Sequence, residues 1–310
     1  MTATADVSAP PDEATAAQRA ARVRLRRAPA PRRPPPPWQP PGDRRLVALV
    51  AVVVLLGLTA WSVVQAVALG ALSQSRAQNV LHSRLREQLA GQTAPLGTVQ
   101  PGDPVALMTI PTLGVEQVVV EGTASSDLQA GPGHRRDTPL PGQRGASVLY
   151  GKALTWGAPF RSISTLTVGD GITATTGQGS FVYRVIGVRR GGDPLPPATA
   201  TNRLTLASVD VHALMPGDVV YVDAVLVGDP VIGTGRVSAI PDPEKALGTD
   251  AGGLPLLAVA LALLLAAALA TVSLHGRLPV PVLWTLGTPV VLAALWLAGD
   301  QAGQLLPNLF

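Results

Sequence analysis

The sequence predicts a mainly β domain that apolar helices hold at a membrane. Between residues 103 and 230, short segments rich in β-branched and aromatic residues alternate with Gly, Pro and Asp turns. Many short strands with such punctuation are typical of a closed barrel or a sandwich. Long apolar runs lie on both sides of this region, and about 20 apolar residues suffice for a helix to cross a bilayer.

The composition excludes several kinds of chemistry. The 310 residues are 47% hydrophobic and include no cysteine, which rules out disulfides, thiolate metal sites and thiol catalysis. The four histidines are scattered (His82, His134, His212 and His275), so we expect no metal site and no cofactor. The pI near 10.1 reflects arginines beside an apolar run, a pattern that reports membrane orientation more often than nucleic-acid binding. We therefore expect no nucleic-acid partner.

The N-terminal part predicts a cytoplasmic tail and a first membrane span. Residues 1–45 are rich in Pro and Arg and should be disordered, although Pro34–Pro37 could also bind a proline-reading module. Residues 46–70 form the predicted span. Arg44 and Arg45 directly precede it, which places the N-terminus in the cytoplasm and the following domain outside. A cleaved signal peptide is the alternative, but the apolar run is longer than a usual signal core, which favours a retained anchor.

Residues 71–102 predict a stalk helix followed by a linker. Ala77, Leu81, Leu85 and Leu89 recur at intervals of four residues, which is a helical period. The stretch from Gly91 onwards is rich in Gly and Pro and should end the helix. The stalk would continue the membrane helix and could lie along the β domain.

The β domain is expected to span residues 103–230. Seven strands are predicted, at 105–110, 115–121, 146–150, 171–175, 181–189, 203–208 and 218–227. Thr123 or Ser125 could cap a short helix, because Ser and Thr side chains accept hydrogen bonds from free amides at a helix start. A second short helical piece is predicted from Phe160 to Leu166, with Ile163 on the same side, facing the core.

The C-terminal part predicts a membrane hairpin. Residues 231–253 form a linker, and residues 254–274 form an almost unbroken Leu and Ala run that can span. Residues 278–298 can span as well, because membrane helices tolerate their prolines. With three spans, the connection at Arg277 would lie in the cytoplasm, and residues 299–310 would be a short tail outside.

Motifs between residues 103 and 227 resemble those of sortases, in particular of an actinobacterial, class E-like sortase domain. The motifs are Ile110–Val115, Val120–Thr123, Ala130–His134, Thr138, Pro141–Gly142, Gly157–Phe160, Leu166, Gly169–Asp170 and Phe181–Val185. The resemblance implies a small closed β-barrel outside the membrane. It also implies an enzyme that cuts a sorting signal at a threonine and transfers the acyl group to an amine with a Cys, a His and an Arg.

This chain departs from the family at all three catalytic positions. Lys152 stands where the family has His, and Val209 stands at the family's Cys position. The family's Arg position falls near Asp218 or Val219. A valine offers no nucleophilic atom, and a solvated lysine has a pKa near 10.4. We expect Lys152 to be a solvated cation at the cleft mouth and the barrel to have lost the family's reaction.

One alternative keeps catalysis with relocated residues. Ser208 precedes the Cys position and could form a dyad with Lys152. Neighbouring residues of a strand point to opposite faces, however, so Ser208 should face away from the cleft if Val209 faces it. Ser208, Asp210 and His212 resemble a shuffled triad, but they should lie beyond direct hydrogen-bond reach on a strand. The sequence favours a polar strand end that enters a loop at Val211–Pro216.

The resulting hypothesis is a catalytically silent, membrane-anchored sortase-like protein on the outer face of an actinobacterial-type plasma membrane. It would bind a sorting-signal peptide, or a surface protein or active sortase, at the cell envelope. Possible neighbours of the peptide groove are Tyr150, Trp156, Ser208 and His134, of which His134 should mainly form a loop hydrogen bond. The alternatives are a hydrolase or transpeptidase with a Ser208–Lys152 site, or a barrel that only spaces the membrane helices.

Overall fold

The computed structural model describes residues 52–310, apart from 53–55, 198–200, 213–214, 234 and 275–278. Three sequence-based expectations lie outside these residues. They are the disordered tail at 1–45, the beginning of the first predicted span, and the cytoplasmic connection at Arg277.

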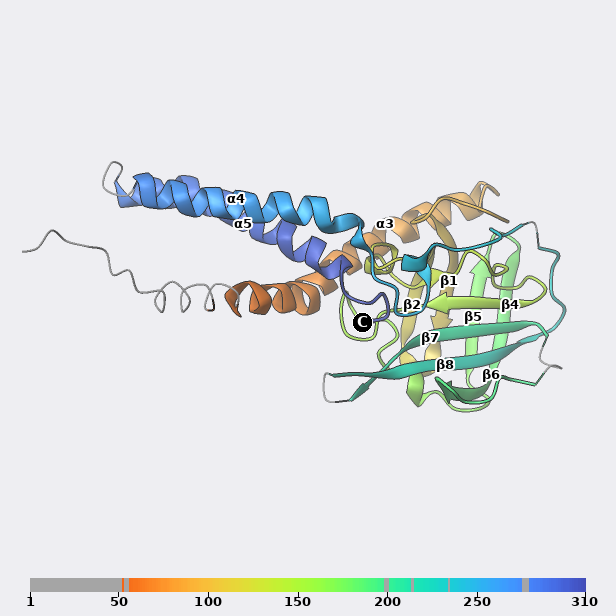
Figure 1. Ribbon diagram of the computed structural model, residues 1–310. Helices are drawn as coiled ribbons and strands as arrows, with labels where there is room; N and C mark the ends of the chain where they lie inside the picture. The colour runs from red at the N-terminus through yellow and green to blue at the C-terminus, as the bar shows by residue number, and fades with distance from the viewer. Residues whose placement is uncertain (1–51, 53–55, 198–200, 213–214, 234, 275–278) are drawn as a thin grey trace, which may run out of the picture. The chain divides into compact units, whose positions relative to one another are not determined.

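Eight strands close into a barrel in the order β1-β2-β3-β4-β7-β8-β6-β5 (Figure 1). The strands are β1 (Pro104–Ile110), β2 (Val115–Glu121), β3 (Gly133–His134), β4 (Ala146–Tyr150), β5 (Gly171–Thr176), β6 (Gly179–Arg190), β7 (Arg203–His212) and β8 (Met215–Val227). The prediction of a mainly β fold with a closed barrel is confirmed.

All seven predicted strands are present, and the differences from the prediction are local. The strand β3 was not predicted because two residues show no alternation, and it exists by pairing parallel to β2 and antiparallel to β4. The predicted loop at Val211–Pro216 is wrong in extent. The β7–β8 pairing continues to His212 and Met215, past a register shift between Val209 and Val211.

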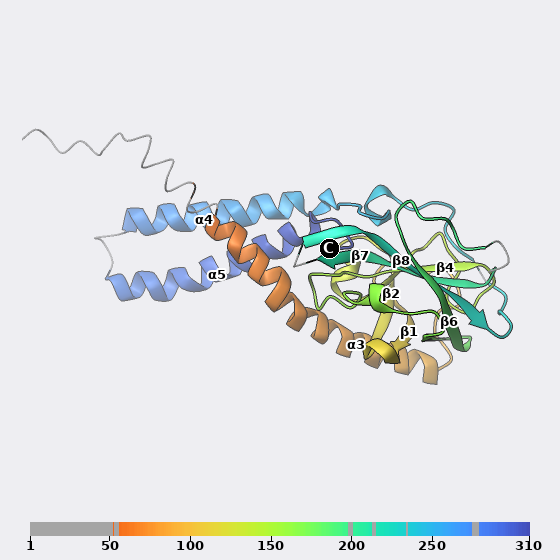
Figure 2. The same ribbon diagram turned by 90° about the horizontal axis from the view of Figure 1, so that it is seen from below.

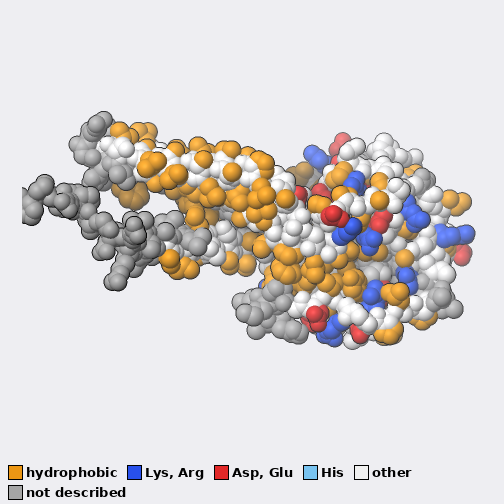
Figure 3. All heavy atoms as spheres, viewed as in Figure 1, with side chains coloured by type: hydrophobic (Ala, Val, Ile, Leu, Met, Phe, Trp, Pro, Cys, Tyr) orange, Lys and Arg blue, Asp and Glu red, His pale blue; other side chains and the backbone are white. Residues whose placement is uncertain are grey.

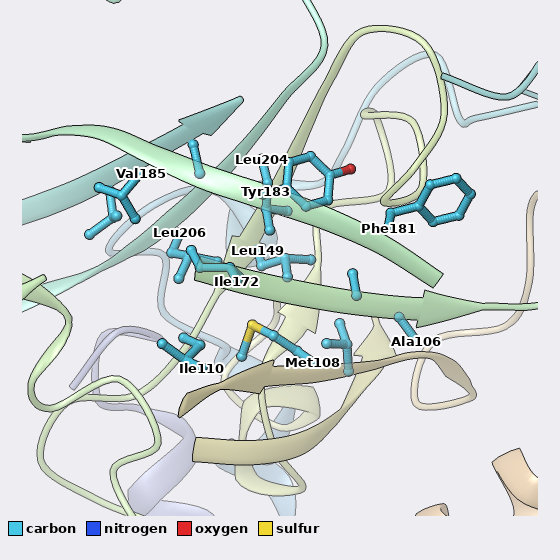
Figure 4. Packing of buried hydrophobic residues seen from close by; sticks show 14 of the residues in the cluster. Ala106, Met108, Ile110, Leu149, Ile172, Phe181, Tyr183, Val185, Leu204 and Leu206 are labelled. Atoms are coloured by element: carbon cyan, nitrogen blue, oxygen red, sulfur yellow. The ribbon is translucent and has the colours of Figure 1, made fainter. Parts of the chain in front are cut away.

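The barrel core follows from the alternation of apolar residues along the strands (Figure 4). Leu204 and Leu206 of β7 are buried in the same cluster as Ile172 and Tyr183. Strand residues alternate between two faces, and the intervening Ala207 and Val209 belong to a second cluster. Phe160, Ile163 and Leu166 face the core as expected, although only Ile163–Thr165 forms a short 3-10 helix.

The predicted stalk is the helix α3 (Gly70–Ala90), which contacts β1 and β2 (Figure 2). Leu81 and Leu85 pack against Val118 and Val120. The side chain of Gln78 also forms two hydrogen bonds with the backbone of β2. Its Oε1 accepts from the Val118 N–H at 2.7 Å, and its Nε2 donates to the Val118 carbonyl at 3.0 Å. The stalk is therefore docked on the barrel.

Three apolar helical segments accompany the barrel. Two helices, Leu56–Ala90 and Ala251–Ala270, are long and apolar enough to cross a membrane by length and composition. The third predicted span corresponds to α5 (Val280–Gln304), which runs beside α4 (Leu254–Leu274). Hydrophobic side chains cover much of the surface that α4 and α5 show in Figure 3.

Candidate functional site

The fold brings the substituted sortase positions together. Strands β4 and β7 run parallel, and Tyr150 at the end of β4 pairs with Ala207 of β7. Lys152 follows β4 by two residues, and Val209 lies two residues beyond Ala207. Val209 in turn pairs with Val219 of β8. The neighbouring Asp218 is exposed, so of the two possible Arg positions Val219 lies against the site.

Gly151 and Phe160 fix the path of the chain at Lys152. A Cβ at position 151 would collide with the Phe160 ring, so this close approach requires glycine. The Phe160 amide also donates to the Lys152 carbonyl at 3.1 Å. The strand, the glycine and the aromatic ring therefore hold the Lys152 backbone in one position.

The expectation that Lys152 is solvated is wrong. Its side chain is 0% exposed. The Nζ atom donates to Ser125 Oγ at 3.1 Å and lies 5.2 Å from the centre of the Trp156 ring. Burial disfavours the ammonium form and lowers the pKa of Lys152 from 10.5 to about 7. At neutral pH this amine is therefore close to its titration midpoint.

Ser125 is a site residue that sequence reasoning misjudged. The 3-10 helix Asp127–Gln129 has no side-chain cap, so the predicted capping role is wrong. Thr123 Oγ1 instead donates to the Glu244 carbonyl at 2.7 Å, and Ser125 Oγ donates to the Gly303 carbonyl at 3.4 Å. Ser125 links Lys152 to the end of α5. Because Gly303 is 178 residues away in sequence, no local pattern reveals this contact.

Val209 makes the Cys position apolar and buried. It is 2% exposed and clusters with Leu128, Tyr150 and Leu309. Tyr150 thus lies in the same apolar cluster as Val209. A side chain without a heteroatom cannot attack an acyl carbon, so the family's reaction has no nucleophile at this position.

Ser208 is bonded away from Lys152. It is buried on the same strand face as Leu204 and Leu206, and its Oγ donates to the Gly151 carbonyl at 2.7 Å. Asp210 accepts from Ser164 and from Arg190, at 3.2 and 2.9 Å. The Ser208 and Asp210 side chains therefore have separate partners. The Ser208 proton points at a backbone carbonyl and not at an amine.

Trp156 joins the site to the first apolar helix. The segment Gln65–Leu69 is a π-helix, and the amide of Gly70 donates to the Gln65 carbonyl. The Ala66 carbonyl accepts from the Trp156 amide at 3.0 Å. Such π segments often mark functional positions. The Trp156 ring also lies against Gly303, where a Cβ would collide with it.

His134 forms a buried hydrogen-bonded pair apart from Lys152. Its Nδ1 lies 2.8 Å from Glu121 Oε2, and its Nε2 lies 3.0 Å from the Pro139 carbonyl. This agrees with the expected loop hydrogen bond. The pair ties β3 to β2 and to the following loop.

Residues 305–310 fill the space beside the vestigial centre. Asn308 and Leu309 are both 0% exposed. The Leu309 carbonyl accepts from the Ala153 amide at 3.1 Å, and the Phe310 carbonyl accepts from Thr155 Oγ1 at 2.5 Å. The predicted tail at 299–310 is shorter than expected, because α5 continues to Gln304. The remaining residues pack on the loop that carries Lys152, a placement that no motif in the sequence indicated.

Comparisons with known proteins identify the domain. Residues 108–208 match the sortase domain family. Sortase D of Bacillus subtilis (strain 168) is 33% identical over 85 residues, which cover 27% of this chain and 41% of that protein. Sortase SrtE1 of Streptomyces coelicolor is 31% identical over 117 residues, which cover 36% of this chain and 33% of that protein. The chain thus spans less than half the length of these curated relatives.

Solved sortase structures are also similar. A Sortase D5 transpeptidase of Clostridium perfringens is 24% identical with a TM-score of 0.40, and the match covers 49% of this chain and 99% of that one. Sortase E1 of Streptomyces coelicolor is 26% identical with a TM-score of 0.37, and the match covers 43% and 93%. From the matched family and the two curated relatives, we conclude that this cysteine-free chain contains a domain of the sortase family.

Proposed function

We propose that this protein is a membrane-anchored, catalytically silent sortase that binds an extended peptide segment without cutting it. The single observation that carries the proposal is the state of the reaction centre. A buried valine replaces the nucleophile, and a chain segment lies against it through hydrogen bonds and apolar contacts.

The electrostatics of the site support a binding role. Lys152 donates to Ser125 Oγ, and the Ser125 hydroxyl donates in turn to the Gly303 carbonyl. A general base must accept the proton of its nucleophile, whereas the Ser125 hydroxyl donates to the Gly303 carbonyl. This relay stabilises a folded contact.

The alternative enzyme would use Ser208 and Lys152. Two contacts count against it, because Ser208 Oγ donates to Gly151 and Lys152 Nζ donates to Ser125. Catalysis would require both side chains to exchange partners. The binding hypothesis needs no rearrangement of the serine.

The ligand class follows from the family resemblance. Sortases act on threonine-containing sorting signals, so the proposed partner is such a peptide, or a surface protein or active sortase that presents one at the cell envelope. The apolar helices support a multi-pass location in the plasma membrane, with the N-terminus in the cytoplasm and the barrel outside.

The test uses the full-length protein in detergent with a threonine-containing sorting-signal peptide that carries a photo-crosslinker. At millimolar peptide, we expect crosslinks to Leu128, Tyr150 or Ala153 and no cleaved or amine-transferred product by mass spectrometry. A peptide with alanine in place of threonine is the control for specificity. Cleavage that disappears in Ser208→Ala or Ser125→Ala would establish the enzyme instead.

A further inference from the structure

Asn308, in the segment 305–310 beside Val209, is surrounded by backbone carbonyls from other parts of the chain. The Asn308 amide nitrogen donates to the carbonyls of Thr123 at 2.7 Å, Lys245 at 2.9 Å and Pro243 at 3.4 Å. The Asn308 backbone amide donates to the Gly248 carbonyl at 2.9 Å. The Asn308 side-chain nitrogen thus faces carbonyl oxygens, whereas its Oδ1 has no hydrogen-bond partner among the described residues, so these contacts select a hydrogen-bond donor at this position.

The pocket is held in shape by contacts that do not involve the segment. Arg136 binds both carboxylate oxygens of Glu244, at 2.6 and 3.0 Å. Thr123 Oγ1 fixes the Glu244 carbonyl, and the Gly248 amide donates to the Lys245 carbonyl at 2.8 Å. A bidentate Arg–carboxylate pair is a strong and directional contact. The carbonyls that face Asn308 are therefore positioned by other residues.

The two residues after Asn308 add an apolar contact at the vestigial reaction centre. Leu309 is fully buried in the cluster that contains Tyr150 and Val209, and Phe310 packs at the edge of that cluster. Burial of a leucine side chain stabilises such a contact. The carbonyls around Asn308 and this apolar cluster together contact the sequence Asn308-Leu309-Phe310.

The segment belongs to no helix or strand, so its release would break no regular element. Helix α5 ends at Gln304, and residues 305–310 contain no helix or strand. Pro307 cannot continue a helix because it lacks an amide hydrogen. This short irregular segment makes all the contacts described for Asn308, Leu309 and Phe310.

We infer that residues 305–310 are a displaceable intramolecular ligand of the sortase groove, and that its external partner is a peptide with an Asn-Leu-aromatic sequence. The inference rests on the proposed function, because it names the peptide class that the groove takes. An external peptide must compete with residues 305–310. Its apparent dissociation constant equals the intrinsic one divided by the fraction of molecules in which residues 305–310 are released.

The absence of cysteine allows a direct measurement of tail release. A thiol introduced by Leu309→Cys is expected to react with maleimide about a hundredfold more slowly than one introduced by Val168→Cys. This ratio corresponds to an open form that makes up about 1% of the molecules. Val168 is 74% exposed and serves as the reference. Adding Asn308→Asp should restore fast labelling, because a carboxylate would face three carbonyls. Leu306→Asp adds the same charge at a partly exposed position of the tail and should leave Leu309→Cys protected.

Binding to full-length protein in detergent completes the test. A fluorescent peptide with the sequence of residues 303–310 should bind the Asn308→Asp variant at least about tenfold more tightly than the wild type. The same peptide with Asp in place of its Asn is the control and should not bind. Rapid labelling of Leu309→Cys in the otherwise unchanged chain would overturn the inference.

The remaining outcomes separate the inference from the proposed function. If the Asn308→Asp variant binds a threonine sorting-signal peptide and not the Asn-Leu-Phe peptide, the inference fails and the proposed function stands. If it binds only the Asn-Leu-Phe peptide, the inference stands and the sorting-signal ligand is excluded.

Discussion

Lys152 shows how one substitution changes the character of a site. In water a lysine is charged at neutral pH, but here burial disfavours the charged form. The Lys152 Nζ lies against Ser125 and Trp156, and Ser125 in turn contacts Gly303 of α5. The sequence identified the residue and its place after β4. It could not predict burial, because burial depends on residues far apart in the chain.

Lys152 should make stability depend on pH in a defined window. Its pKa is about 7 in the folded protein and 10.5 in the unfolded chain, so the unfolded chain binds more protons between these values. The free energy of unfolding should therefore rise as pH increases from 7 towards 10.5. The Lys152→Met variant should lack this rise and be more stable than wild type near pH 7, by an amount on the order of 5 kcal/mol at most.

Denaturant unfolding of the full-length protein between pH 6 and 9 checks this expectation. The matched control is Lys245→Met, which removes only an exposed ion pair with Asp242 and should leave the pH profile unchanged. A wild-type profile that is flat across this range would contradict a buried, neutral Lys152.

Helix α5 has a position where only glycine fits. A Cβ at Gly303 would collide with the Trp156 ring, whereas nothing lies within 4 Å of a Cβ at Gly287 of the same helix. Gly303→Ala should therefore destabilise the protein by about 1–3 kcal/mol. Gly287→Ala should be neutral or stabilise slightly, since alanine favours helix. Thermal unfolding of both variants in detergent checks this, and equal melting temperatures would contradict a tight Trp156–Gly303 contact.

At the level of elements, periodicity predicted most of the fold. The four-residue spacing of Leu81 and Leu85 predicted α3 and the face that packs on β2. Strand alternation predicted that Ser208 and Val209 lie on opposite faces, which their separate environments confirm. Two elements lack such a pattern. The strand β3 is defined only by its neighbours, and the tail at Asn308 is ordered by carbonyls from other loops.

At the scale of the whole molecule, topology stays a prediction that labelling of intact cells can check. Val168→Cys on the barrel should react with a membrane-impermeant maleimide, because the arginines before the first span favour a cytoplasmic N-terminus. Thr4→Cys should react only after lysis. Labelling of both in intact cells would exclude the proposed orientation.

The hydrogen bond between the Trp156 amide and the Ala66 carbonyl has a geometric consequence. Ala66 belongs to the predicted first span, and Trp156 belongs to the loop that carries Lys152. The bond therefore ties the loop of Lys152 to the first apolar helix, and a rotation of the barrel about that helix would have to break it. In the proposed membrane location, the loop of Lys152 would lie near the surface of the bilayer.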